Sequence, residues 1–211
     1  ESFYLALSEA PNAVHELLDK ITLYTIRWIK EIQRIGGNKL NPATCPPIWC
    51  PQQGKGYFIA DDTMSLISPE MHREFSLPYI NRITKECGPV CYHSCTWREE
   101  YFNNIHQLNN VLCFNWNPGN SIDPAIIIKE FSGEAVLAPH IVHNMHKDKD
   151  VLKWNPNFTD ESELVRYFLD HLQDNSSIFF WFSNISENGP IMEKIYNLFS
   201  ERRYTPDTVI D

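Results

Sequence analysis

The chain contains five short runs of largely apolar residues, and the segments between them have the residue pattern of helices. Strands that are apolar almost throughout and alternate with helices are typical of a parallel sheet whose outer face is covered by helices. The chain is therefore predicted to have an α/β fold, and a doubly wound sheet and a (β/α) barrel both fit the pattern. The predicted strands are YFIADD from Tyr57, PVCYHSC from Pro89, VLCFNW from Val111, AVLAPHIV from Ala135 and SSIFFWFSN from Ser176.

Capping residues mark several of the predicted helices. Ser68 with Pro69 begins a helix that ends before Gly88, and Asp123 begins another that stops at Gly133. Further helices are predicted over residues 11–35, 98–108, 160–174 and 189–203. Because no repeat, linker or low-complexity tract divides the chain, residues 1–211 are expected to form a single domain.

Composition and charge exclude some classes of partner. The 211 residues carry a formal net charge of −9, which disfavours binding to nucleic acid or to an anionic membrane. A chain with 43% hydrophobic residues can build a core without disulfides, so its six cysteines are expected to be thiols in a reducing cytoplasm. The tryptophans are expected to pack in the core and at its rim; they are Trp28, Trp49, Trp97, Trp116, Trp154 and Trp181.

Polar residues stand at the end of every predicted strand. In parallel α/β folds the active site lies at the carboxyl ends of the strands, so these side chains are expected to converge on one site. Nucleotide binding is disfavoured, because no strand is followed by a glycine-rich phosphate loop. The residues at these ends are Asp61, Asp62, His93, Cys95, Asn115, His140, Ser183 and Asn184.

The pair His93 and Cys95 is the most specific of these elements. Residues two apart in a strand point to the same side, so the imidazole and the thiol could hold one ion, and Cys91 shares that side. Imidazole and thiolate are typical zinc ligands. The alternative is that Cys91 and Cys95 are small buried residues and that His93 is a hydrogen-bonded core histidine. Spacing alone favours this alternative, because two ligands do not make a metal site.

The segment IADDTMSLISPEMHREFSLPYINRI, followed by GPVCYHSC, resembles the uroporphyrinogen decarboxylase superfamily. It is most similar to the branch of cobalamin-dependent methyltransferases that act on corrinoid proteins and coenzyme M. The resemblance implies a (β/α)8 barrel of the TIM type. It also implies that this chain is a C-terminal fragment with about the last five β/α units.

The same resemblance implies a zinc site. His93 and Cys95 match the first two ligands of the family, whereas the third family ligand is a cysteine after the last strand, where this chain reads WFSNISENGP. His140 is the expected replacement, and Cys91 is the alternative. Asp61, which matches a family aspartate, and its neighbour Asp62 are expected to orient substrate or metal ligands. Asn115 is included with them as a catalytic residue.

The implied reaction moves a methyl group between a corrinoid protein, which presents methylcobamide, and a zinc-activated thiol or related small-molecule acceptor. The zinc would make the thiolate available at neutral pH. Two alternatives stay open. One is a metal-free decarboxylase, and the other is a degenerate member of the superfamily that binds a ligand without chemistry.

Overall fold

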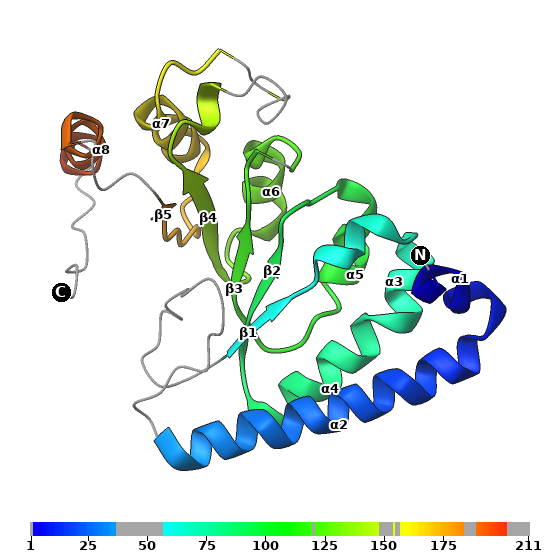
Figure 1. Cartoon of the computed structure of the whole chain (residues 1–211). Helices are drawn as coiled ribbons and strands as arrows, with labels where there is room; N and C mark the ends of the chain where they lie inside the picture. The colour runs from blue at the N-terminus through cyan, green and yellow to red at the C-terminus, as the bar shows by residue number, and fades with distance from the viewer. Residues whose placement is uncertain are drawn as a thin grey trace.

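Five parallel strands form one sheet at the centre of the chain (Figure 1). The computed structural model describes residues 2–36, 57–119, 121–147, 154, 157–183 and 189–201. The strand order in the sheet follows the order of the chain without a reversal. The predicted α/β fold with a parallel sheet is confirmed. The strands are β1 (Tyr57–Ala60), β2 (Val90–Ser94), β3 (Val111–Trp116), β4 (Val136–Val142) and β5 (Trp181–Ser183).

One face of the sheet carries the main hydrophobic core. Tyr57, Tyr92 and Phe114 project from this face and pack against buried apolar residues of the helices, such as Ile80 and Ile128. The opposite face carries a smaller apolar cluster, which consists of Phe58, Cys91, Cys113, Val136, Ala138 and Trp181. Because side chains alternate along each strand, one face of the sheet packs against the helices and the other face carries the smaller cluster.

The helices follow the predicted order, with two departures. The helix predicted over residues 98–108 is a 3-10 turn followed by a short α-helix, and another predicted helix is interrupted. The helix predicted from Ser68 to Gly88 is divided at Ser76, because Pro78 has no N–H for the carbonyl of Glu74 and its ring crowds that carbonyl. The α-helices are α1 (Ser2–Glu9), α2 (Pro11–Gly36), α3 (Pro69–Phe75), α4 (Leu77–Cys87), α5 (Phe102–Ile105), α6 (Pro124–Phe131), α7 (Glu161–His171) and α8 (Gly189–Glu201). The 3-10 turns are η2 (Asp62–Leu66), η3 (Glu99–Tyr101) and η4 (Met145–Lys147).

Side-chain caps and glycines mark the ends of the two helices where the sequence predicts them. The Ser68 hydroxyl accepts a hydrogen bond from the Met71 N–H, and the Asp123 carboxylate accepts one from the Ala125 N–H. Gly88 and Gly133 follow their helices with φ values of 100° and 84°, which favour glycine. Both helix starts and both stops are thus confirmed.

The cysteine prediction is wrong at two positions. Cys91 and Cys113 form a disulfide between the neighbouring strands β2 and β3, where the register places the two residues opposite each other. Cys87 and Cys95 are free thiols, as predicted. Cys45 and Cys50 lie outside the described residues, as does Trp49. No helix in the described part of the chain is long and apolar enough to cross a membrane.

The tryptophan prediction holds for the centre of the sheet and fails on α2. Trp97 and Trp116 are fully buried, and their rings contact each other in the main core. Trp28 leaves 53% of its surface exposed, because it lies on the side of α2 that faces solvent. The helix predicted over residues 11–35 is present, but only some of its apolar residues are buried.

Candidate metal centre

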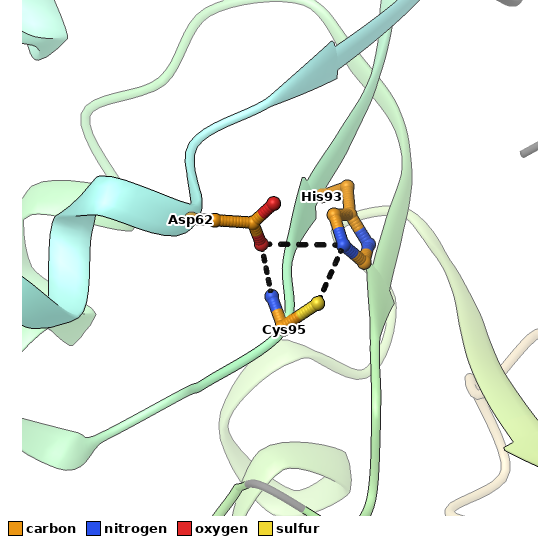
Figure 2. Close-up of side chains that lie close together, drawn as sticks. All are labelled: Asp62, His93 and Cys95. Carbon is orange, nitrogen blue, oxygen red and sulfur yellow. Dashed lines mark hydrogen bonds and ion pairs between the residues drawn. The ribbon is translucent and has the colours of Figure 1, made fainter. Parts of the chain in front are cut away.

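Three potential metal ligands meet at the carboxyl ends of β1 and β2: Asp62, His93 and Cys95 (Figure 2). One ligand atom from each residue lies within 4.8 Å of the others. His93 Nε2 is 3.2 Å from Cys95 Sγ and 3.4 Å from the Oδ1 atom of Asp62. The arrangement combines one nitrogen, one sulfur and one oxygen on one side of the sheet.

These separations fit the dimensions of a tetrahedral zinc site. Zinc bonds of about 2.0 to 2.3 Å at tetrahedral angles place neighbouring ligand atoms roughly 3.3 to 3.8 Å apart. The His93 Nε2–Asp62 Oδ1 distance lies in that range. The His93 Nε2–Cys95 Sγ distance is about 0.3 Å shorter than a nitrogen–sulfur pair on zinc. The Asp62 and Cys95 ligand atoms lie within 4.8 Å of each other, so small side-chain shifts would complete the geometry. Imidazole nitrogen, thiolate sulfur and carboxylate oxygen are all ordinary zinc donors. The residues present therefore fit a zinc ion by spacing and by chemistry.

Asn115 sets the orientation of the His93 ring. The Asn115 amide nitrogen donates to the carbonyl oxygen of Ala138, so its side-chain oxygen faces His93 Nδ1. That oxygen accepts a hydrogen bond from Nδ1, which leaves the Nε2 lone pair directed towards Cys95 and Asp62. Histidines that bind metals usually donate a hydrogen bond from one ring nitrogen to a fixed acceptor and bind the metal through the other ring nitrogen.

The register of β2 and β3 explains this contact. His93 lies opposite Asn115, one step further along the same face from the Cys91–Cys113 disulfide. The Asn115 side chain is fully buried and His93 is nearly so. Asn115 was expected to be catalytic, and the structure places it behind His93 as a positioning residue.

The chain after β2 holds Cys95 next to Asp62. The Cys95 backbone N–H donates to Asp62 Oδ1 at 2.7 Å, and the Cys95 carbonyl accepts from the Ser121 hydroxyl. The same hydroxyl accepts from the Trp97 N–H, so one serine fixes both ends of this short loop. Cys95 is half-buried and the Asp62 side chain is 52% exposed, so within the described residues the group contacts solvent on the Asp62 side.

The thiol of Cys95 is held in its neutral form when no cation is close. Burial raises its pKa to about 11, and the charge of Asp62 and a hydrogen bond with it add to this effect. A carboxylate beside a thiol is unfavourable for a free cysteine nucleophile, since it opposes ionisation. A divalent cation reverses that effect by compensating both negative groups. The electrostatics therefore favour a metal ligand over a metal-free nucleophile.

Asp61 faces the opposite side of the sheet from Asp62. Its carboxylate accepts hydrogen bonds from Ser76 at 2.7 Å, from His72 Nε2 at 2.9 Å and from the Tyr92 hydroxyl at 3.1 Å. Burial alone would raise the pKa of Asp61, but these three contacts outweigh it and hold the pKa below its ordinary value. Asp61 thus ties β1 to the two helices that follow it and does not face the metal group.

The residues behind Asp61 complete that network. His72 is fully buried, and its Nδ1 accepts from the Asn104 amide nitrogen, so Nε2 carries the proton donated to Asp61. The amide is oriented by Arg73, which donates to the Asn104 oxygen, and by the Pro69 carbonyl, which accepts from its nitrogen. These contacts link β1, α3 and α5 through one buried chain of hydrogen bonds.

His140 lies on β4, two strands from His93, and is not in the group of three. Its Nε2 hydrogen-bonds to the Ser183 hydroxyl at 2.8 Å, and its ring stacks on Trp181 with centroids 3.7 Å apart. Burial, and then the neighbouring His93, lower its pKa to about 4. The structure therefore brings Asp62, and not His140, to His93 and Cys95. Asn184, the other residue expected after β5, lies outside the described residues.

The sequence contained a signal for Asp62 as a ligand. Tyr57 and Ile59 face the helices, so continued alternation places Asp61 on that face and Asp62 on the face of His93. Cys91, the alternative third ligand, is bonded to Cys113 and has no thiolate to offer.

Comparison with known proteins does not add to this picture. No protein-family model matches the chain, and no significantly similar curated protein or solved structure is found.

Proposed function

We propose that this chain is a zinc-dependent methyltransferase of the uroporphyrinogen decarboxylase superfamily, which moves a methyl group between a corrinoid protein and a thiol. The observation that carries the proposal is the convergence of one ligand atom each from His93, Cys95 and Asp62, all within 4.8 Å of one another. His93 and Cys95 are the two residues that match the His-x-Cys motif in the resemblance. Asp62 takes the place of the family's third ligand, a cysteine.

A (β/α)8 barrel of the TIM type, with this chain as about its last five units, is the architecture we propose for the fold. Doubly wound sheets reverse their strand order at a switch point, whereas the strands here follow one another in chain order. A barrel is built by that sequential order. The second face of the sheet would then be the interior of the barrel, and the metal group would lie at its carboxyl mouth.

The chain's own residues have distinct roles in this proposal. His93, Cys95 and Asp62 hold the ion, Asn115 fixes the proton on His93 Nδ1, and Asp61 anchors the end of β1. A bound zinc ion supplies Lewis acidity, which lowers the pKa of a thiol placed on it. Three protein ligands are the number found in catalytic zinc sites, where one position stays open for substrate. The exposed side of Asp62 is the route by which a small thiol would arrive.

The methyl donor is inferred from the residues SPEMHREFSLPY and GPVCYHSC, which carry the resemblance. In this reaction the sulfur of the acceptor gains the methyl carbon, the carbon–cobalt bond breaks with its electron pair left on cobalt, and the thiol proton is released. The corrinoid is held by the partner protein and reaches the site only during transfer.

The test uses the zinc-loaded complete protein, in which the preceding barrel units of the proposed architecture are present, with methylcobalamin and 2-mercaptoethanol, and follows the loss of methylcobalamin by absorbance. We expect His93→Ala and Cys95→Ala to remove the transfer, while Glu99→Ala, on the exposed turn η3, leaves it unchanged. Transfer that survives zinc chelation or either ligand substitution would contradict the proposal. Zinc binding without transfer would instead identify a degenerate member that retains the ion.

A further inference from the structure

The disulfide between Cys91 and Cys113 lies directly beside the contact that orients the metal ligand His93. Cys91 lies opposite Cys113, and two residues further along the same strands His93 lies opposite Asn115. Residues two apart in a strand share one face and are separated by about 6.6 Å along it. The disulfide therefore forms the layer next to the His93–Asn115 pair on the second face of the sheet.

The pairing of β2 with β3 changes register at the disulfide. Val90 pairs with Val111, whereas Cys91 pairs with Cys113, so one residue of β3 is left out between the two pairs. An extra residue of this kind interrupts the ladder of backbone hydrogen bonds locally. The register that places His93 beside its hydrogen-bond acceptor thus begins at the disulfide, and the ladder before it is already interrupted.

The two sulfur atoms have little room to separate. Cys91 and Cys113 are 0% and 1% exposed, and they pack in one cluster with Ala138, Phe58 and Val136. Two thiols need more room than a disulfide, because sulfur atoms that are not bonded cannot approach closer than van der Waals contact. Reduction must therefore push the two strands apart at this layer, where the interrupted ladder resists least.

A movement at Cys113 reaches His93 through Asn115. The Asn115 side chain accepts a hydrogen bond from His93 Nδ1 and donates one to the carbonyl of Ala138, so it ties β3 to the strands on both sides. Ala138 also packs in the same cluster as the disulfide. Because outer contacts of this kind orient a metal-binding histidine, a displaced Asn115 would leave the His93 ring free to turn.

We propose that the Cys91–Cys113 disulfide is a redox switch for the metal centre. The oxidised form holds His93 in the orientation that binds zinc, and the reduced form releases the ring and weakens zinc binding. The switch rests on the metal group of the proposed function and adds its control by thiols. It involves bonds between β2, β3 and β4 alone, all of which lie in the described part of the chain.

The reductant is a low-molecular-weight thiol. Its thiolate attacks one cysteine sulfur, the sulfur–sulfur bond breaks, and the other cysteine leaves as a thiolate that takes up a proton. A second small thiol attacks the mixed disulfide, which frees the remaining cysteine and releases the two small molecules as their own disulfide. The cysteine pair gains two electrons and two protons, and the small thiols supply them. Because both sulfurs are buried, the exchange requires a local opening of the strand pair.

The test compares the oxidised and reduced forms of the complete protein. One sample is unfolded in urea with a phosphine reductant, refolded without oxygen and freed of the reductant, and the other passes through the same steps without reductant. Mass spectrometry verifies that Cys95 is a thiol in both. In competition with a chromophoric chelator, we expect the reduced form to bind zinc at least about tenfold more weakly. In zinc-free protein, proton–nitrogen NMR spectra should show the His93 proton on Nδ1 in the oxidised form and a mixture of tautomers in the reduced form.

Two variants serve as controls. The double variant Cys91→Ala, Cys113→Ala has no switch and is expected to bind zinc equally after both treatments. Cys87→Ala removes a buried free thiol of α4 and is expected to keep the tenfold difference.

Circular dichroism verifies that each sample is folded. Equal zinc affinities or equal His93 tautomers in the two wild-type forms would overturn the switch and leave the metal centre standing. So would a difference that persists in the double variant, or a reduced protein that does not refold, since the disulfide would then serve the fold as a whole. Absence of zinc binding in both forms would instead refute the metal centre, and the switch with it.

Discussion

Replacement of Asn115 by leucine tests how the metal group is built, because this residue touches the site only through His93. Asn115→Leu keeps the volume of the side chain and removes both of its hydrogen bonds, one to His93 Nδ1 and one to the Ala138 carbonyl. The His93 ring then loses the acceptor that fixes its tautomer and direction. Loss of such an outer contact typically weakens metal binding about 10- to 100-fold, or about 1.4 to 2.7 kcal/mol.

The assay is a competition titration of zinc against a chromophoric chelator. The control is Thr84→Val, which removes a hydrogen bond from a buried side chain of α4 remote from the site. Both substitutions are expected to lower the free energy of unfolding of the zinc-free protein by about 1 to 3 kcal/mol, but only Asn115→Leu is expected to weaken zinc binding. Asn115→Asp keeps an acceptor for His93 and is expected to lie between wild type and Asn115→Leu. If folded Asn115→Leu binds zinc as tightly as Thr84→Val does, the assigned role of Asn115 is wrong.

Three further predictions concern groups around the site. Asp61→Asn places an amide against three donors and should lower the free energy of unfolding by about 2 to 4 kcal/mol in urea titrations at pH 7. The pKa of Asp61 in the folded protein lies below its ordinary value of 3.8, so the ionised carboxylate stabilises the fold above pH 3.8 and this stabilisation is lost as the pH falls through the folded pKa. Asp61→Asn should therefore flatten the acid side of a plot of the free energy of unfolding against pH. An unchanged plot would refute this role of Asp61. In zinc-free protein, the rate of Cys95 alkylation, followed by peptide mass spectrometry, should increase with pH up to the thiol pKa of about 11. Asp62→Asn should shift this increase to lower pH. A midpoint near pH 8 in the wild type would contradict the raised pKa of Cys95. Reduction of the disulfide between Cys91 and Cys113, which are 22 residues apart, should lower the free energy of unfolding by about 3 kcal/mol, whereas Cys113→Ser should show no such change on reduction.

Much of the fold could be predicted from the apolar runs. Parallel strands that are buried on both faces contain few polar residues. The apolar runs that begin at Val111 and Ala135 therefore predict strands without any knowledge of the strands beside them, and the structure has β3 and β4 there. The break at Ser76 was missed, although Pro78 is a signal for it, because the capping residues Ser68 and Gly88 suggested one continuous helix.

The candidate site was predicted in part. His93 and Cys95 were found because both lie in one strand and its extension, where a period of two places them on the same side. The contacts that cross between strands were missed, because they depend on register. Ala60 pairs with His93 and thereby places Asp62 beside Cys95, while His93 lies opposite Asn115. The disulfide depends on the same register, since Cys91 lies opposite Cys113.

The exposed side of α2 shows another limit. A helix pattern identifies apolar positions but does not distinguish those that pack inside the domain from those that remain at its surface. Trp28 and Ile26 are both apolar and only two residues apart, yet Ile26 is buried against the core while Trp28 is exposed. The difference is set by where α4 lies, which is a tertiary contact and not a property of the helix alone.

X-ray absorption at the zinc edge tests whether Asp62, His93 and Cys95 hold one zinc ion, as we propose. We predict one sulfur per zinc at about 2.3 Å, with nitrogen and oxygen ligands at about 2.0 to 2.2 Å, including one imidazole. Cys95→Ser should remove the sulfur contribution, and Asp62→Asn should leave it in place while weakening zinc binding. Two or more sulfurs per zinc, no sulfur, or a spectrum that Cys95→Ser leaves unchanged would contradict the account.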